Sequence, residues 1–242
     1  MTTLLLVHAF PVDAGMWDDQ ISDLSGDAHV LAPSLPGFGG TPAAGDVLTM
    51  DAAADFLAGE LDRSETEKAV VCGLSMGGYI AFSLWRRHRD RIAGLALADT
   101  RAEADDEAGK EKRRGLAAKV RTEGSEPVAE APPPLLSETA DPALWDRVKQ
   151  MIRRQSGDAI AAAALGMAER PDSLPILGEI DVPTTVIVGG GDTLTPPEVS
   201  ETIAKGITGS ELITLEGAGH LSNLEDPEGF TRALRDLLGR SG

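Results

Sequence analysis

The sequence predicts an α/β protein built around one parallel sheet. Short apolar runs alternate with longer amphipathic stretches, which is the pattern of β-α-β units whose strands are buried on both faces. A Gly-x-Ser-x-Gly motif lies where one of these runs passes into a helical stretch. An aspartate and a histidine follow two later apolar runs, and loops at the carboxyl ends of strands in such a sheet can reach one common site.

Six strands are expected from the apolar runs. They span Thr3–His8, His29–Ala32, Ala69–Gly73, Ile92–Ala98, Thr184–Val188 and Glu211–Leu215. Helices are expected on both faces of the sheet, at Met16–Leu24, Met50–Leu61, Met76–His88, Pro197–Lys205 and Pro227–Leu238. Because only Met1 and Thr2 precede the first strand, we expect no antiparallel leading hairpin and a sheet that is parallel throughout.

The segment 101–178 breaks this alternation and is predicted to be a helical cap lying over the sheet. It is rich in Ala, Glu and Arg and contains no convincing strand. Helical patterns occur at Glu107–Thr122, Asp141–Gln155 and Asp158–Glu169, and Pro132–Pro134 interrupts them. The predicted organisation is therefore a core of residues 1–100 and 179–242 with a cap of residues 101–178.

Composition excludes several classes of function. The 242 residues carry a net charge of −17, whereas nucleic-acid binding needs clustered Lys and Arg, and the same charge disfavours anionic membranes. The acidity fits a solvated surface or adaptation of the host to high salt. No apolar stretch reaches the roughly 18 residues of a membrane span and no signal peptide is recognisable, so a cytoplasmic location is expected. The single cysteine, Cys72, lies in an apolar run, which predicts a small buried hydrophobe rather than a disulfide or zinc ligand.

The strongest functional signal is the motif Gly73-Leu74-Ser75-Met76-Gly77. At a strand-to-helix junction this pattern is typical of a nucleophile elbow, in which the serine adopts a strained backbone conformation. The flanking Gly73 and Gly77 let strand and helix approach each other closely. The turn would project the Ser75 hydroxyl into the site and leave the amide of Met76, at the helix N-terminus, directed at an oxyanion.

A serine nucleophile needs a base, and the chain has only four histidines. His220 follows the last predicted strand in a glycine-containing loop and is the candidate base. His8 ends the first strand and is interpreted as structural, while His29 opens the second strand and His88 lies among arginines at a helix end.

The third member of a triad is a carboxylate that fixes the tautomer of the imidazole. Asp192 follows the strand Thr184–Val188 across three glycines and lies between Ser75 and His220 in chain order, so it is the preferred candidate. Asp99, which directly follows the strand Ile92–Ala98, is the competitor.

The order of these motifs along nearly the whole chain resembles the α/β-hydrolase superfamily. The residues that carry the resemblance are His8-Ala9-Phe10-Pro11, Gly37-Phe38-Gly39, Gly73-Leu74-Ser75-Met76-Gly77-Gly78, Asp192 and Gly219-His220. The resemblance implies that the amide of Phe10 joins that of Met76 in the oxyanion hole and that no cofactor is used. Ala9 departs from the pattern, because relatives usually have glycine there.

Within the superfamily, parts of the chain are similar to 3-oxoadipate enol-lactonases and their relatives. These parts are the elbow, Met16-Trp17-Asp18-Asp19-Gln20 and Ala98-Asp99-Thr100, whereas residues 32–39 are more similar to general esterases. The expected function is therefore a serine hydrolase that cleaves a small carboxylic ester or lactone through an acyl-enzyme on Ser75. The serine itself argues against haloalkane dehalogenases, which use an aspartate at this position.

Three other functions use the same scaffold. Cofactor-free perhydrolase or haloperoxidase chemistry and carbon–carbon bond hydrolysis share the triad. A ligand-binding protein without catalysis would be favoured by the loss of a triad member, and none is lost. The sequence leaves the choice among the enzymes, and the oligomeric state, open.

The cap supplies the candidates for substrate binding. Residues 101–178 carry 12 basic and 14 acidic side chains, a net charge of −2 against −15 for the rest of the chain. The candidates are Trp145, Arg113, Arg114, Arg153 and Arg154. One or two of the arginines would point inward to bind a substrate carboxylate, as an enol-lactone requires. The alternative is that they form solvated helix faces with i,i+4 ion pairs.

Overall fold

The computed structural model describes residues 1–242 and contains one six-stranded sheet with the order β2-β1-β3-β4-β5-β6. The strands are β1 Thr3–Val7, β2 His29–Leu31, β3 Ala69–Leu74, β4 Ile92–Ala98, β5 Thr184–Gly189 and β6 Glu211–Leu215. Every neighbouring pair is parallel, so the predicted parallel sheet is confirmed. All six strands occur where the apolar runs predict them, with ends shifted by at most one residue.

Helices cover both faces of the sheet, because the inner strands β1, β3, β4 and β5 turn apolar side chains to both sides. The helices of the sheet region are α1 Asp18–Leu24, α2 Met50–Arg63, α3 Met76–His88, α8 Pro197–Gly206, α9 Ser222–Glu225 and α10 Pro227–Arg240. Helices α1 and α10 pack on one face, in a cluster that includes Leu24, Phe230 and Leu234. Helices α2, α3 and α8 pack on the other face, with Leu57, Ile80 and Ile203. No helix is both long enough and apolar enough to cross a membrane.

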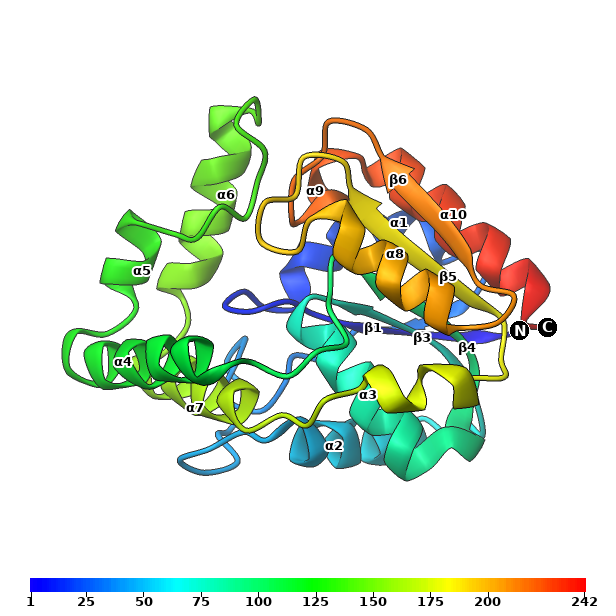
Figure 1. Ribbon diagram of the computed structural model, residues 1–242, viewed down its shortest axis with the longest axis horizontal. Helices are drawn as coiled ribbons and strands as arrows, with labels where there is room; N and C mark the ends of the chain where they lie inside the picture. The colour runs from blue at the N-terminus through cyan, green and yellow to red at the C-terminus, as the bar shows by residue number, and fades with distance from the viewer.

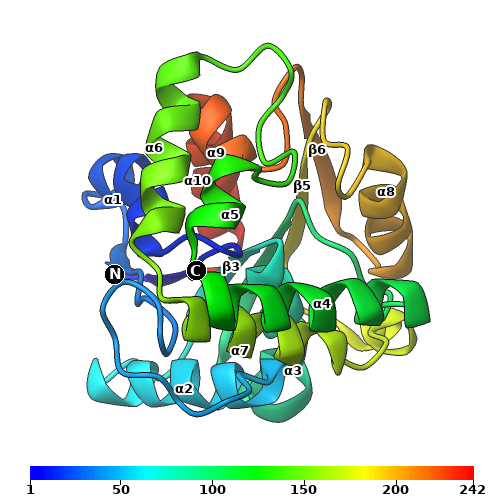
Figure 2. The same cartoon turned by 90° about the vertical axis from the view of Figure 1, so that its left-hand side faces the viewer.

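The segment between β4 and β5 contains no strand, and its four α-helices lie over one end of the sheet (Figures 1 and 2). Its helices are α4 Glu107–Glu123, α5 Glu126–Glu130, α6 Pro142–Arg153 and α7 Gly157–Ala168. Three of these correspond to predicted helices. The short α5 is not predicted, because five residues that include Pro127 carry no helical period.

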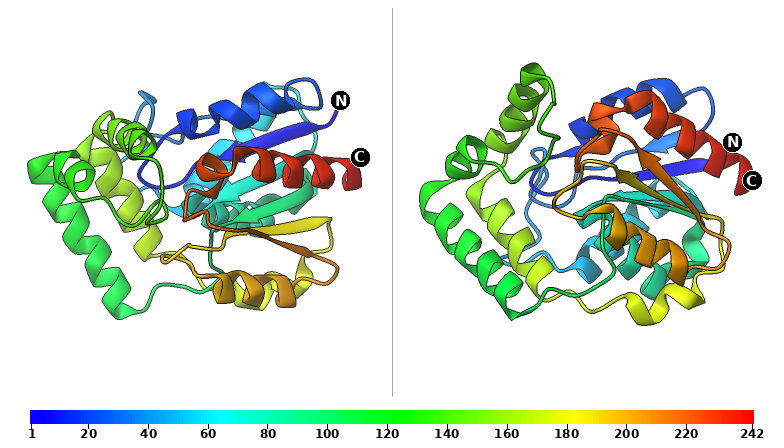
Figure 3. Two further views of the ribbon diagram at one scale, coloured as in Figure 1. Left: turned by 90° about the horizontal axis from the view of Figure 1, so that it is seen from above. Right: turned by 45° about the horizontal axis from the view of Figure 1, so that its top comes forward.

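The four helices cover the carboxyl edge of the sheet, while both chain termini lie at the opposite end (Figures 1 and 3). Helices α4 and α7 run side by side, and Gly157 permits this contact, because a Cβ there would lie 2.0 Å from the carbonyl oxygen of Val120. Ser75, Asp192 and His220 follow the carboxyl ends of β3, β5 and β6, so they lie on the side of the sheet that these helices cover.

Candidate active site

Ser75 lies at a sharp turn between β3 and α3, with φ 55° and ψ −112°. This conformation is rare for a residue with a side chain and costs about 1–3 kcal/mol, so the surrounding packing must hold it. A Cβ on Gly73 would lie 2.2 Å from the carbonyl oxygen of Gly77, and a Cβ on Gly77 would lie 2.2 Å from that of Val7. The two glycines of the motif therefore allow the close approach of β1, β3 and α3 that holds Ser75 in this turn.

Ser75, His220 and Asp192 form one continuous chain of hydrogen bonds. The Oγ atom of Ser75 lies 2.8 Å from Nε2 of His220, and Nδ1 of His220 lies 2.8 Å from Oδ2 of Asp192. His220 and Asp192 are buried, with 2% and 3% of their surface exposed. The structure thus brings together the three residues that the motif order predicts, although they come from three separate loops.

Asp192 is held by its own loop as well as by His220. Its Oδ1 accepts hydrogen bonds from the amides of Leu194 at 2.8 Å and Thr195 at 3.0 Å. The Thr195 hydroxyl donates to Oδ2 at 2.6 Å. Burial by itself would raise the pKa of Asp192, but the hydrogen bond and charge of His220 and the bonds from Thr195 outweigh burial and lower that pKa. Asp192 is therefore an ionised acceptor that fixes the imidazole, and Thr195 is a contributor that the sequence analysis missed.

Asp99, the competing carboxylate, has other partners. It is buried at the end of β4 with φ 44°. Its Oδ1 accepts the amide of Gly189 at 2.7 Å, and its Oδ2 accepts the hydroxyl of Ser222. Burial, and then the charge of Asp192, raise the pKa of Asp99 well above its usual range. Asp99 makes no hydrogen bond to His220. Through Gly189 and Ser222 it instead links the ends of β4 and β5 to the loop that follows His220.

The loop after β1 is fixed by the neutral imidazole of His8. Its Nδ1 donates to the carbonyl oxygen of Ala9 at 2.8 Å, and its Nε2 accepts the amide of Leu35 at 3.0 Å. Complete burial lowers the pKa of His8 to about 4, which keeps this arrangement uncharged at neutral pH. His8 is therefore the structural histidine that the sequence indicates.

The two amides expected in the oxyanion hole have no acceptor within the protein. Met76 is the first residue of α3, where amides have no partner in the helix, and Phe10 lines the cavity in front of Ser75. Ala9 is completely buried in the core and does not line this cavity, so its methyl group takes up no space there.

A cavity of about 410 Å³ lies between the carboxyl edge of the sheet and the covering helices, with Ser75 and His220 in its wall. The apolar part of the wall consists of Phe10, Leu116, Leu135, Met167 and Leu194. Three cations, Arg101, Lys112 and Arg113, line the cavity, and Asp105 is the only acid among the lining residues. A protein of net charge −17 thus places an excess of positive charge beside its candidate nucleophile.

Of the five predicted substrate-binding residues, the structure brings only Arg113 to the cavity. Its guanidinium pairs with Asp105 through Nε and reaches the Met167 sulfur through Nη1 at 3.3 Å. The other four do not line it. Arg114 pairs with glutamates at the surface, Arg153 pairs with Glu126 at 2.8 Å, Arg154 is exposed, and Trp145 packs against the hydrophobic core. Arg114, Arg153 and Arg154 therefore lie on solvated helix faces, which is the alternative that the sequence analysis left open.

Three further lining residues escaped the sequence analysis. Tyr79 lies one turn after Ser75 on α3, and the guanidinium of Arg170 stacks 4.1 Å from the centre of its ring. Tyr79 lies four residues after Ser75, and this spacing places two side chains on the same face of a helix, so the sequence could have indicated Tyr79. Arg101 lies three residues after the end of β4 and donates to the carbonyl oxygen of Leu194 at 2.8 Å. Lys112 carries no such signal, because most positions of α4 are polar and the helix buries only Ala117 and Val120. No group of three or more His, Cys, Asp or Glu side chains is placed to hold a metal ion.

Residues 2–227 match the family model described as the alpha/beta hydrolase fold. The chain belongs to the α/β-hydrolase family. An esterase from Thermogutta terrifontis, solved with malate bound, is similar in structure to this hydrolase. Its TM-score is 0.97 and its sequence identity 43%, over 100% of this chain and 90% of that chain.

Two further relatives indicate the class of reaction. The enol-lactonase of Burkholderia xenovorans LB400 has a TM-score of 0.90 and 29% identity, covering 98% of this chain and 91% of that chain. A pimeloyl-acyl-carrier-protein methyl ester esterase of Neisseria meningitidis serogroup C is 31% identical over 96% of this chain and 92% of its own length. The predicted class of this α/β-hydrolase, a carboxylic ester hydrolase, is therefore confirmed.

Proposed function

We propose that this α/β-hydrolase cleaves a small ester or lactone through an acyl-enzyme on Ser75, with His220 as general base and Asp192 as the residue that orients it. The observation that carries the proposal is the unbroken chain of hydrogen bonds from Asp192 through His220 to the Ser75 hydroxyl, in the wall of a cavity. A serine hydroxyl is a weak nucleophile until a base within hydrogen-bond reach takes its proton.

In the first half of the reaction, the Ser75 oxygen attacks the carbonyl carbon while its proton passes to Nε2 of His220. The negative charge on the carbonyl oxygen is stabilised by the amides of Phe10 and Met76, which have no other acceptor. Asp192 stabilises the imidazolium and holds its Nδ1 proton. When the tetrahedral intermediate collapses, the ester bond breaks and the alcohol leaves with the proton from His220.

In the second half, water attacks the acyl carbon and gives a proton to His220. The Ser75 oxygen then leaves, regains a proton from His220, and the carboxylic acid is released. A lactone follows the same steps, except that the alcohol and the acid stay in one molecule.

The lining of the cavity supports a substrate whose acyl part carries a carboxylate. The cavity is lined by three cations, Arg101, Lys112 and Arg113, and by one acid, Asp105. Asp105 is already paired with Arg113 and Arg170. The volume of about 410 Å³ suits a small molecule. The relative from Thermogutta terrifontis binds malate, a dicarboxylate, and the relative from Burkholderia xenovorans is an enol-lactonase. In this proposal residues 101–178 act as a cap that supplies all three cations.

The test is the variant Ser75→Ala, assayed on short-chain p-nitrophenyl esters alongside a fluorophosphonate probe. We expect wild type to be labelled on Ser75 and the variant to be neither labelled nor active, with an unchanged melting temperature. The elbow accommodates the smaller side chain, and no other hydroxyl is hydrogen-bonded to Nε2 of His220. Turnover by the variant at a rate near that of wild type would overturn the mechanism.

A further inference from the structure

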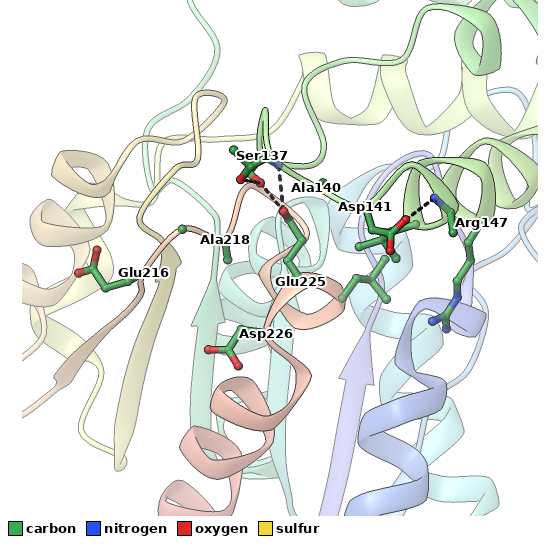
Figure 4. A pocket seen from close by; sticks show the side chains of 13 residues that line it. Ser137, Ala140, Asp141, Arg147, Glu216, Ala218, Glu225 and Asp226 are labelled. Atoms are coloured by element: carbon green, nitrogen blue, oxygen red, sulfur yellow. Dashed lines mark hydrogen bonds between the residues drawn. The ribbon is translucent and has the colours of Figure 1, made fainter.

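The carboxylate of Glu225 binds two chain segments at once. Its Oε2 accepts the amide of Gly219, the residue before His220, at 2.7 Å. Its Oε1 accepts the hydroxyl of Ser137 at 2.6 Å, and the Ser137 amide lies 3.0 Å from Oε2. Figure 4 shows Ser137 above Glu225, joined to it by dashed lines. Ser137 belongs to the connector between α5 and α6, residues 131–141.

A second bond fixes the other side of His220 to the same connector. The amide of Leu221 donates to the carbonyl oxygen of Leu135 at 2.7 Å. The backbone on both sides of His220 is therefore attached to residues 135–137, once directly and once through Glu225. Leu135 also lines the cavity at Ser75, so the connector both holds the His220 loop and forms part of the cavity wall.

Gly219 is needed for this contact. A Cβ at that position would lie 2.4 Å from the amide nitrogen of Ser137 and 2.9 Å from Oε2 of Glu225. The loop also contains Gly217, whose φ of 80° favours glycine. A loop with two glycines so close to the base has wide conformational freedom, and contacts from outside the loop must restrict it.

We infer that Glu225 is a positioning residue, which holds His220 within reach of Ser75 by attaching Gly219 to the connector. The inference rests on the proposed role of His220. Proton transfer requires Nε2 to stay near its observed 2.8 Å from Oγ, and a displacement of about 1 Å is enough to cost on the order of 100-fold in rate.

Glu225 does not touch the substrate cavity. It faces a separate cleft of about 630 Å³, which shares no lining residue with the cavity at Ser75. A substitution of Glu225 therefore leaves the substrate contacts in place. It is expected to change kcat and the reactivity of Ser75, whereas KM for the same ester stays close to that of wild type.

The test uses the full chain with Glu225→Ala and Glu225→Gln. The measured quantities are the second-order rate of Ser75 labelling by a fluorophosphonate probe, and kcat and KM for p-nitrophenyl acetate. We expect the Ala variant to lose about 10-fold or more in both labelling rate and kcat, with KM changed less than about threefold. The Gln variant keeps one acceptor oxygen for the two segments, so its rates should lie between those of Ala and wild type.

The matched control is Glu216→Ala. Glu216 lines the same cleft and makes no side-chain hydrogen bond, and Figure 4 shows it pointing away from Glu225. Its variant should label at the wild-type rate. Equal labelling of wild type and the folded Glu225 variants would overturn the inference, as would a Gln variant as slow as the Ala variant. If the Ala variant does not fold, the Gln variant decides alone. Failure of wild type to label would instead contradict the proposed function.

Discussion

Asp99 and Asp192 are two buried carboxylates at the ends of neighbouring strands, β4 and β5, and only Asp192 is hydrogen-bonded to His220. Their environments shift the pKa values of the two carboxyl groups in opposite directions. Burial and the charge of Asp192 raise the pKa of Asp99, whereas the bonds to His220 and Thr195 outweigh burial and lower the pKa of Asp192. Two residues that the sequence presents as alternatives thus have separate roles in one site.

The first prediction compares Asp192→Asn with Asp99→Asn. The side-chain oxygen of an asparagine at position 192 can still accept the amides of Leu194 and Thr195, so its NH2 group faces Nδ1 and donates to it. This favours the imidazole tautomer with its proton on Nε2, which cannot accept the Ser75 proton. We expect kcat to fall by about 10³- to 10⁴-fold. An asparagine at position 99 keeps an acceptor for Gly189 and offers a donor to Ser222, so kcat should fall by less than about tenfold.

The measurement is steady-state kinetics on one ester, with the melting temperature of each variant as the control for folding. A larger loss in the Asp99 variant than in the Asp192 variant would show that the carboxylate acting on His220 has been misassigned.

The second prediction concerns acid stability and His8. The unfolded chain protonates this imidazole below pH 6.5, whereas the folded protein does so only below about pH 4, because complete burial of the ring disfavours its charged form and outweighs the hydrogen bond to Ala9, which raises the pKa. The unfolded state therefore binds more protons in this window, and the free energy of unfolding falls as the pH drops from 6.5 to 4. The difference between the two pKa values corresponds to about 3 kcal/mol.

Urea unfolding of wild type and His8→Gln between pH 7 and pH 4 measures this effect. The variant starts from its own stability at pH 7, so the quantity compared is the decrease on acidification. The decrease in wild type should exceed that in the variant by about 3 kcal/mol, since all other titrating groups are shared. Parallel curves would contradict a neutral, buried His8.

The sequence predicts the sheet and its order of elements well, because burial on both faces makes the inner strands β1, β3, β4 and β5 short, continuous apolar runs. It also predicts Ser75, Asp192 and His220, since each stands at a fixed point relative to a strand end. The short α5 and α9 are not predicted, because a helix of four or five residues has too few turns to show a period.

The lining of the cavity is predicted less completely, because it depends on which face of a covering helix turns inward. Helix α4 buries only Ala117 and Val120, which lie four and seven residues after Arg113, so Arg113 and not Arg114 shares their face of the helix. This pattern is weak, because most other positions of α4 are polar. The contact of Glu225 with Ser137 joins residues 88 positions apart and leaves no mark in the sequence around either residue.

The last prediction concerns the charge of the substrate. The Arg113 side chain is 22% exposed, and its guanidinium uses Nε to pair with Asp105, while its Nη2 has no protein partner. A carboxylate in the cavity can therefore bind the free edge of this guanidinium. The variant Arg113→Met keeps the apolar stem and removes the charge, and Asp105 retains its bond to Arg170 at 2.8 Å, so no buried charge is left without a partner.

The experiment compares p-nitrophenyl hemisuccinate with p-nitrophenyl butyrate, which share a leaving group and differ in the carboxylate. Loss of a charged hydrogen bond of about 1.5–3 kcal/mol should raise KM for the hemisuccinate by roughly 10- to 100-fold, with KM for the butyrate changed less than about threefold. Arg153→Met is the matched control, because Arg153 lies on α6, pairs with Glu126 and does not line the cavity. Added salt should raise KM for the hemisuccinate alone in wild type, because it screens the attraction between unlike charges. If Arg113→Met alters KM for both esters to the same extent, the cavity does not select for a carboxylate and the enzyme is a general esterase.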